Sequence, residues 1–161
     1  MDLYNDTTRE IARLLLDRGE TVSVAESSSG GIISAALLSV PGASGYYLGG
    51  SVVYTLPSRR EFLDIPRDRV SGLEPLSEAM VGVFADAARE KLEASWGVAE
   101  LGAAGPSGSR YGHPAGTSVV GVSGPVNMTR LVQTGSDDRS ENMWAFAEAA
   151  LALLLKSLQA A

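Results

Sequence analysis

Residues 21–31, TVSVAESSSGG, are the stretch around which the rest of the chain is organised. Thr21–Ala25 alternates as a short buried strand does, and the apolar run that begins at Ile32 is typical of a helix. Between them stand three serines, and serine favours the residue just before a helix. The stretch therefore predicts a strand, a turn rich in hydroxyl groups and a helix.

The turn has the composition of a binding or catalytic loop. Gly30 and Gly31 have no side chains, so a ligand can approach the backbone closely. The start of a helix also presents free amide N–H groups and the positive end of the helix dipole. A serine there can attack a carbonyl carbon while neighbouring amides bind the oxyanion. The simpler alternative is that the serines only cap the helix.

Composition limits the classes of function. The 161 residues suit one domain, 1–161, with a substantial core. A net charge of −6 argues against nucleic acid as the main partner, although local arginines can still bind a small anion. No apolar run approaches the roughly 20 residues that cross a membrane, and the polar N-terminus is unlike a secretory signal. We therefore expect neither a nucleic-acid nor a membrane partner.

Metal and thiol chemistry are not expected. The chain has no cysteine, which excludes disulfides and zinc–thiolate sites and fits a cytoplasmic protein. With a single histidine, a metal site would need carboxylates alone, and no EF-hand or similar spacing is present. We expect no metal and no cofactor.

Helical and strand-like segments alternate along the chain. Helices are expected over residues 8–18, 32–40, 58–63 and 77–95 and from 136–138 to about 158, and strands over residues 21–25, 46–54, 98–103, 116–122 and 127–133. This interleaving predicts an α/β domain in which helices cover a sheet, and the hairpin formed by the last two strands makes the sheet mixed.

Polar loops follow three of these strands, at residues 26–31, 55–59 and 105–109. In open α/β sheets, ligands bind beyond the carboxyl ends of the strands. If the three strands are parallel neighbours, their loops converge on a pocket that contains serine hydroxyls, Tyr54 and Arg59 or Arg60. Such a pocket is suited to acyl transfer on a polar or phosphorylated small molecule.

The motifs VAESSSGG, SVPGAS, LGGSVVYT, GAAGPSG and PAGT occur in this order, ahead of Asp138–Arg139. Together they resemble the C-terminal domain of the competence/damage-inducible CinA family over about residues 11–155. The resemblance implies a three-layer α/β/α sandwich that is often dimeric. It also implies a metal-independent serine–lysine amidohydrolase. Stand-alone family members, the nicotinamide-nucleotide amidases, convert nicotinamide mononucleotide and water to nicotinate mononucleotide and ammonia.

The resemblance also assigns roles to residues. It implies that Ser27 is the nucleophile and that Tyr54 and Arg59 stand at the positions of the family's tyrosine and lysine base, so these three are the expected catalytic residues. The expected substrate-binding residues are Ser28, Ser29, Gly30, Gly31, Arg60, Gly105, Pro106, Ser107 and Gly108. Ser28 and Ser29 replace the family's cysteine and threonine, and Leu101 replaces a second threonine.

Arg59 is the departure that affects the chemistry. A lysine acts as a base because its pKa falls readily on burial, whereas arginine stays protonated, with a pKa above about 12. Arg59 can hold a phosphate or polarise a carbonyl but can hardly accept the proton of Ser27. His113 and a deprotonated Tyr54 beside Arg59 are the alternative bases. Lys91 is predicted on the edge of a helix stripe and is not expected to replace the base.

Two hypotheses about function therefore remain. The chain is an amidohydrolase that resembles nicotinamide mononucleotide deamidase, or it is a diverged, weakly active or inactive homologue that binds a small anionic nucleotide. In both cases we expect a homodimer with a small anionic nucleotide as its ligand. A purely structural domain ranks last, since a core alone does not require three polar loops at strand ends.

Overall fold

The strand β1, Val22–Glu26, lies inside a five-stranded sheet and is buried along its whole length. The computed structural model describes residues 2–161. β1 pairs in parallel with β2, Tyr47–Val52, and with β3, Trp96–Ala103. β4, Thr117–Ser123, and β5, Met128–Gln133, continue the sheet in antiparallel fashion as the expected hairpin, giving the order β2-β1-β3-β4-β5. The prediction of a mixed sheet is confirmed.

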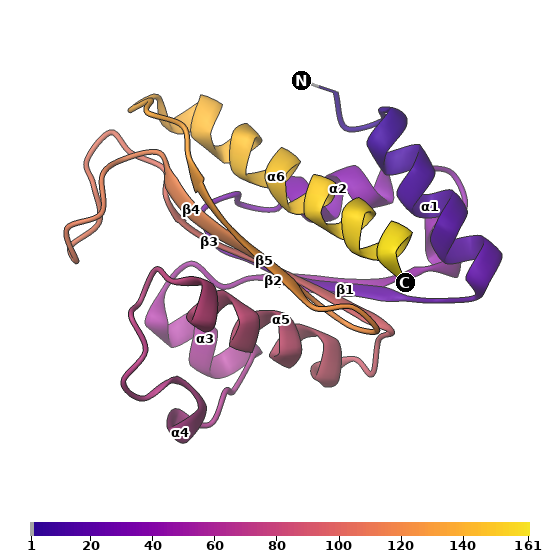
Figure 1. Ribbon diagram of the computed structural model, residues 1–161, viewed down its shortest axis with the longest axis horizontal. Coiled ribbons are helices and arrows are strands. Elements are labelled where there is room, and N and C mark those ends of the chain that lie inside the picture. The colour runs from indigo at the N-terminus through magenta and orange to yellow at the C-terminus, as the bar shows by residue number, and fades with distance from the viewer. Residues whose placement is uncertain (1) are drawn as a thin grey trace.

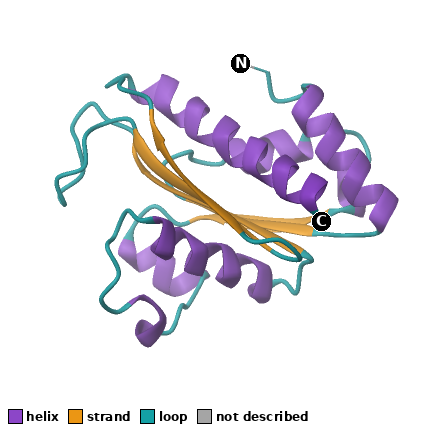
Figure 2. Ribbon diagram, in the orientation of Figure 1, coloured by secondary structure: helices purple, strands orange, loops and turns teal. Residues whose placement is uncertain are grey.

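Helices cover both faces of the sheet (Figures 1 and 2). On one face lie α1, α2 and α6, and on the other lie α3, α4 and α5. Their bounds are Asp6–Arg18 for α1, Ile32–Leu38 for α2, Leu56–Phe62 for α3, Arg67–Val70 for α4, Glu78–Lys91 for α5 and Arg139–Ala160 for α6, and a 3₁₀ turn spans Ala43–Gly45. The three layers form the expected α/β/α sandwich.

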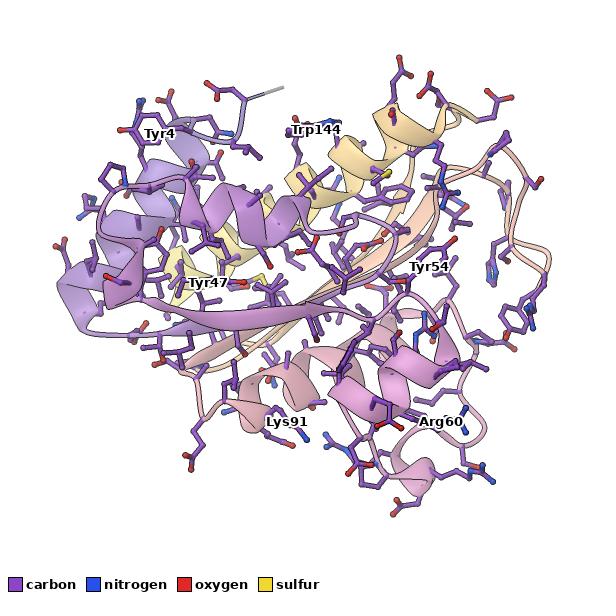
Figure 3. The ribbon with its side chains drawn as sticks, turned by 180° about the vertical axis from the view of Figure 1, so that it is seen from behind. Tyr4, Tyr47, Tyr54, Arg60, Lys91 and Trp144 are labelled. Carbon is purple, nitrogen blue, oxygen red and sulfur yellow. The ribbon has the colours of Figure 1, made fainter. Side chains whose placement is uncertain are left out.

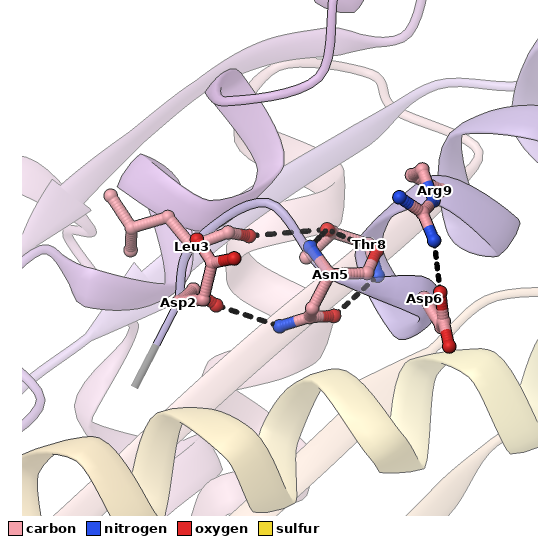
Figure 4. Close-up of polar contacts among 6 residues, drawn as sticks. All are labelled: Asp2, Leu3, Asn5, Asp6, Thr8 and Arg9. Atoms are coloured by element: carbon pink, nitrogen blue, oxygen red, sulfur yellow. Dashed lines mark hydrogen bonds and ion pairs between the residues drawn. The ribbon is translucent and has the colours of Figure 1, made fainter.

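Capping side chains and backbone geometry set the ends of the helices. α1 begins two residues before the expected Thr8, because the side chains of Asn5 and Thr8 each accept a hydrogen bond from the other's backbone amide (Figure 4). Ser77 caps α5 as expected. α5 ends at Lys91 rather than at Ser95, since Glu93 adopts a left-handed conformation with φ 53° that a helix cannot continue.

The core lies in two layers, one on each face of the sheet. α6 contributes Phe146, Ala147, Ala150, Leu151, Leu153, Leu154 and Leu158 to buried positions. Trp144 and Leu155 of the same helix are only partly buried. α6 is long and apolar enough to cross a membrane by length and composition, but here it packs on the sheet as a core helix.

Candidate functional site

The loops after β1, β2 and β3 meet at the carboxyl ends of these strands, because β1 is parallel to both neighbours. A cavity of about 440 Å³ opens between them. Ser27 and Gly102 line it from the β1 and β3 sides, and Tyr54 and Arg59 line it from the segment that follows β2. Thr55, Leu56, Pro57, Ser109, Arg110 and Tyr111 complete the wall. Ser27, Tyr54 and Arg59 therefore share one cavity, which we call the Ser27 cavity.

Ser27 has a hydroxyl without a partner at this cavity. The residue is only 3% exposed, yet its side chain forms no hydrogen bond with any residue in the described part of the chain. Its backbone amide donates to Oε2 of Glu100 at 3.0 Å. The backbone of Ser27 is thus held by the neighbouring strand β3, while its hydroxyl remains available to a ligand.

Glu26, rather than a serine, caps the helix that follows. Its Oε1 accepts hydrogen bonds from the amides of Gly31 at 2.9 Å and Ile33 at 3.1 Å, and its Oε2 accepts from the amide of Ser34 at 3.0 Å. A carboxylate at this place also suits the positive end of the helix dipole. The reading of the serines as caps is therefore wrong: α2 begins at Ile32, five residues after Ser27, and no serine side chain caps it.

Glu100 holds the serine turn from the adjacent strand. Its Oε2 accepts from the amides of Ser27 at 3.0 Å and Ser29 at 2.9 Å, and its Oε1 accepts from the hydroxyl of Ser28 at 2.5 Å. Complete burial raises the pKa of Glu100, and the hydrogen bonds from Ser28 and Ser29 partly oppose that rise. The fully buried carboxyl thus serves as the internal support of the turn.

These contacts leave fewer free backbone amides for an oxyanion than the sequence led us to expect. The amides of Ser27 and Ser29 donate to Glu100, that of Gly31 donates to Glu26, and that of Gly30 donates to the carbonyl of Ser27 at 3.1 Å. Among the turn amides of residues 27–31, only that of Ser28 has no acceptor within residues 2–161. A single backbone donor is therefore left for an oxyanion at Ser27.

Ser28 and Ser29 support the turn instead of lining the cavity. Both are buried, and the hydroxyl of Ser29 lies 2.7 Å from Oε1 of Glu26 and 2.9 Å from Oε2 of Glu100. A hydroxyl carries one proton, so it can donate fully to only one of the two carboxyl groups. A proton on Glu100 removes the repulsion between them, in agreement with the direction of its pKa.

Sequence reasoning missed Glu100, although a signal was present. The tripeptide VAE occurs at residues 24–26 and again at residues 98–100. The register of β1 and β3 places Glu26 directly beside Glu100. A glutamate at the same place in two buried strands marks a pair of inward carboxyl groups where parallel strands end.

Tyr54 is joined to Arg139, not to Arg59 as expected. The phenol is on a 54% exposed residue, and its hydroxyl accepts a hydrogen bond of 3.0 Å from the guanidinium of Arg139. The same guanidinium donates to the carbonyl of Gly105 at 2.5 Å. Arg139, the first residue of α6, thereby ties the segment after β2 to the loop after β3, and the sequence had given it no role.

Arg59 is turned partly away from the Ser27 cavity. Its Nε donates to the carbonyl of Val53 at 3.0 Å, and its guanidinium carbon lies 5.3 Å from the centre of the Phe84 ring. Burial lowers the pKa of Arg59. Arg60, which was expected to bind substrate, does not line the Ser27 cavity. Arg60 lies on α3 (Figure 3) and lines a second cavity, in whose wall Arg59 also takes part.

The glycine-rich turn lies at the expected carboxyl ends of the strands, but it does not line the Ser27 cavity. Gly105 is buried against the segment that precedes α6, where an added Cβ would lie 2.7 Å from the carbonyl oxygen of Asp137. Pro106, Ser107 and Gly108 are exposed, and none of the four lines the Ser27 cavity. The same loop contributes Ser109, Arg110 and Tyr111 instead.

The remaining candidate bases lie elsewhere. Nδ1 of His113 is 2.9 Å from the hydroxyl of Ser109, within its own loop, and His113 does not line the Ser27 cavity. Lys91 lies at the end of α5 (Figure 3). The carbonyl of Ala88, in the preceding turn of α5, accepts a hydrogen bond from Ser23 near the start of β1. Lys91 therefore lies near the amino-terminal end of β1, whereas Ser27 follows its carboxyl end. Of the alternatives considered, only Tyr54 lines the cavity.

No group of three His, Asp or Glu side chains suited to a metal occurs among residues 2–161.

Comparison with known proteins gives concordant matches. The chain matches the family model described as the CinA C-terminal domain over residues 5–158. A CinA-like protein of Parasynechococcus marenigrum is 37% identical over 136 residues, which are 84% of this chain and 32% of that protein. A CinA-like protein of Desulfosudis oleivorans is 37% identical over 150 residues, 92% of this chain and 36% of the relative. The chain therefore spans about a third of the length of these relatives.

Solved structures match over the whole length. A CinA superfamily protein from Klebsiella pneumoniae superposes with a TM-score of 0.90 at 25% identity and covers 100% of both chains. The competence/damage inducible protein CihA from Agrobacterium tumefaciens gives a TM-score of 0.83 at 27% identity, with 99% of both chains covered.

Proposed function

Because the chain belongs to the CinA C-terminal domain family, we propose that it is an amidohydrolase that converts nicotinamide mononucleotide to nicotinate mononucleotide and ammonia. The observation that supports this most is the hydroxyl of Ser27, which has no partner in the described chain and faces the Ser27 cavity. Arg59 and Arg110 line the same cavity and supply positive charge for the phosphate of the substrate. The proposed ligand is thus a small anionic nucleotide.

In the proposed reaction, the Ser27 hydroxyl attacks the carboxamide carbon while Tyr54 acts as the base that takes its proton. The free amide of Ser28 binds the oxyanion. Tyr54 returns the proton to the leaving nitrogen, ammonia departs, and an ester to Ser27 remains. Water then hydrolyses this ester, releasing nicotinate mononucleotide and restoring the serine. Arg139 is a positioning residue here, because it holds the hydroxyl of Tyr54.

The second candidate is a binder of the same nucleotide with little or no activity. Arginine at position 59 favours it, since the guanidinium cannot take the proton of Ser27 and its Nε is engaged with Val53. We further propose that the protein is cytoplasmic and binds neither nucleic acid nor membranes, in line with its charge of −6 and its lack of cysteine. That it is a homodimer is proposed from the family alone.

An ammonia-release assay with nicotinamide mononucleotide tests the proposal. Wild type should release ammonia, Ser27→Ala should not, and the exposed-residue variant Ser140→Ala should match wild type. Ammonia release that persists in Ser27→Ala would contradict the assignment of the nucleophile. Saturable binding of nicotinate mononucleotide without any ammonia release would favour the second candidate.

A further inference from the structure

A second cavity of about 380 Å³ lies on the other side of α3 from Ser27. Three arginines line it, Arg59 and Arg60 from α3 and Arg67 from α4. The remaining lining is apolar: Leu56, Ile65, Val70, Met80 and Phe84. We call it the arginine cavity. No carboxylate lines it, although the chain as a whole is acidic, with a net charge of −6.

The three arginines have no ion-pair partner in the described chain. Within residues 2–161 none of them forms an ion pair, whereas the neighbouring Arg69 on α4 pairs with Glu90 at 3.1 Å and Asp86 at 3.8 Å. Like charges at a common cavity repel one another. Burial separately lowers the pKa of Arg59, because it removes the guanidinium from water. An anion in the cavity would relieve that repulsion.

The apolar lining of the cavity favours a ligand that has an apolar group beside its anionic group. The side chains of Met80 and Phe84 are largely covered by the protein and turn apolar atoms toward the cavity. The ring of Phe84 already carries the guanidinium of Arg59 on its face at 5.3 Å, so an anion held by Arg59 lies beside an apolar surface. The volume is within the roughly 300–1,000 Å³ of pockets that hold small molecules.

We propose that the arginine cavity is a binding site for a phosphate monoester with an aromatic group, of mononucleotide size. Three guanidinium groups match the several terminal oxygens and two charges of a phosphate monoester better than the single charge of a carboxylate. The aromatic group covers the apolar floor. This site is distinct from the Ser27 cavity: Arg60 and Arg67 line the arginine cavity alone, while Arg59 and Leu56 belong to both walls.

Calorimetric titration of the full chain with AMP tests the site. AMP should bind saturably, and adenosine, which lacks the phosphate, should bind at least about tenfold more weakly, since charge-assisted hydrogen bonds contribute about 1.5–3 kcal/mol. Arg60→Ala and Arg67→Ala should each weaken AMP binding by about tenfold, and the double variant should abolish it.

Two controls locate the binding. Arg130→Ala removes an exposed arginine of β5, and Arg110→Ala removes one that lines the Ser27 cavity. Arg130→Ala should not change the affinity for AMP, whereas Arg110→Ala separates the two cavities, because a loss confined to that variant would place AMP in the Ser27 cavity. Thermal melts should show all variants folded, because Arg60 and Arg67 are exposed. Equal affinity for adenosine and AMP, wild-type affinity in the Arg60/Arg67 double variant, or a loss confined to Arg110→Ala would each overturn the proposal.

Discussion

The guanidinium of Arg139 donates a hydrogen bond of 3.0 Å to the hydroxyl of Tyr54, across 85 residues of sequence. The guanidinium carbon also lies 6.0 Å from the centre of the Tyr54 ring. Tyr54 itself is more than half exposed, so this arginine and the backbone fix its orientation. The proposed base therefore depends on a residue from the first turn of the last helix.

Replacing Tyr54 or Arg139 should separate chemistry from binding. Tyr54→Phe removes the proton acceptor and should lower kcat for nicotinamide mononucleotide by about 10²–10⁴-fold with little change in KM. Arg139→Gln should lower kcat less, and Arg139→Lys should recover part of the loss. Steady-state ammonia release measures both constants. Full activity in Tyr54→Phe would exclude the tyrosine as base.

Arg59→Lys should increase the rate of deamidation. Arginine cannot take a proton near neutral pH, whereas a lysine can, because the burial that lowers the pKa of Arg59 would also lower that of a lysine there. The matched control is Arg60→Lys on the same helix, which lies outside the Ser27 cavity and should leave kcat unchanged. If wild type is already fast and Arg59→Lys slows it, the base lies elsewhere, and His113→Ala then tests the histidine.

Glu100→Gln should remove a pH dependence of stability. Burial raises the pKa of Glu100 above its usual value of about 4.3, so the folded state holds a proton that the unfolded state has lost. The contribution of protonated Glu100 to the free energy of unfolding is complete at low pH. It falls as pH rises above the unfolded value, because the folded state binds more protons than the unfolded state.

Urea unfolding between about pH 4.5 and pH 8 measures that slope. Glu100→Gln should show a flatter dependence on pH than wild type. Glu148→Gln, at an exposed position of α6, should retain the wild-type slope. Identical slopes in wild type and Glu100→Gln would mean that the carboxyl is ionised throughout the range.

Replacing two glycines by alanine, one in β3 against α5 and one within α5, should change the stability of the fold in opposite directions. At Gly97 in β3 an added Cβ would lie 2.2 Å from the carbonyl oxygen of Ala85, so Gly97→Ala should destabilise the fold by about 1–3 kcal/mol or more. At Gly82 in α5 the nearest atom would be 3.9 Å away, so Gly82→Ala should stabilise it by up to about 1 kcal/mol. Thermal or urea unfolding of the two variants tests this contrast, and destabilisation by Gly82→Ala would show that α5 has no room there.

Local patterns were enough to predict the frame of the site. The alternation in residues 21–25, the glycines after it and the apolar run from Ile32 predict β1, the turn and α2, and the alternation of elements predicts the mixed sheet. The role of Glu100 could not be read from local pattern, because it depends on the register of β1 against a strand more than 70 residues away. The same holds for Arg139, whose contact with Tyr54 exists only once the strands have brought their loops together.

The anchoring of the Ser27 turn has a consequence for how this site tolerates change. The nucleophile wall rests on Glu26 and Glu100 inside the sheet, whereas the opposite wall is α3, which has no buried residue. A substitution on α3, such as the arginine at position 59, can therefore alter the chemistry without moving Ser27. Ser27 is thus held by the strands and Arg59 stands on an exposed helix, so the partner of the serine can be exchanged while the serine turn keeps its supports.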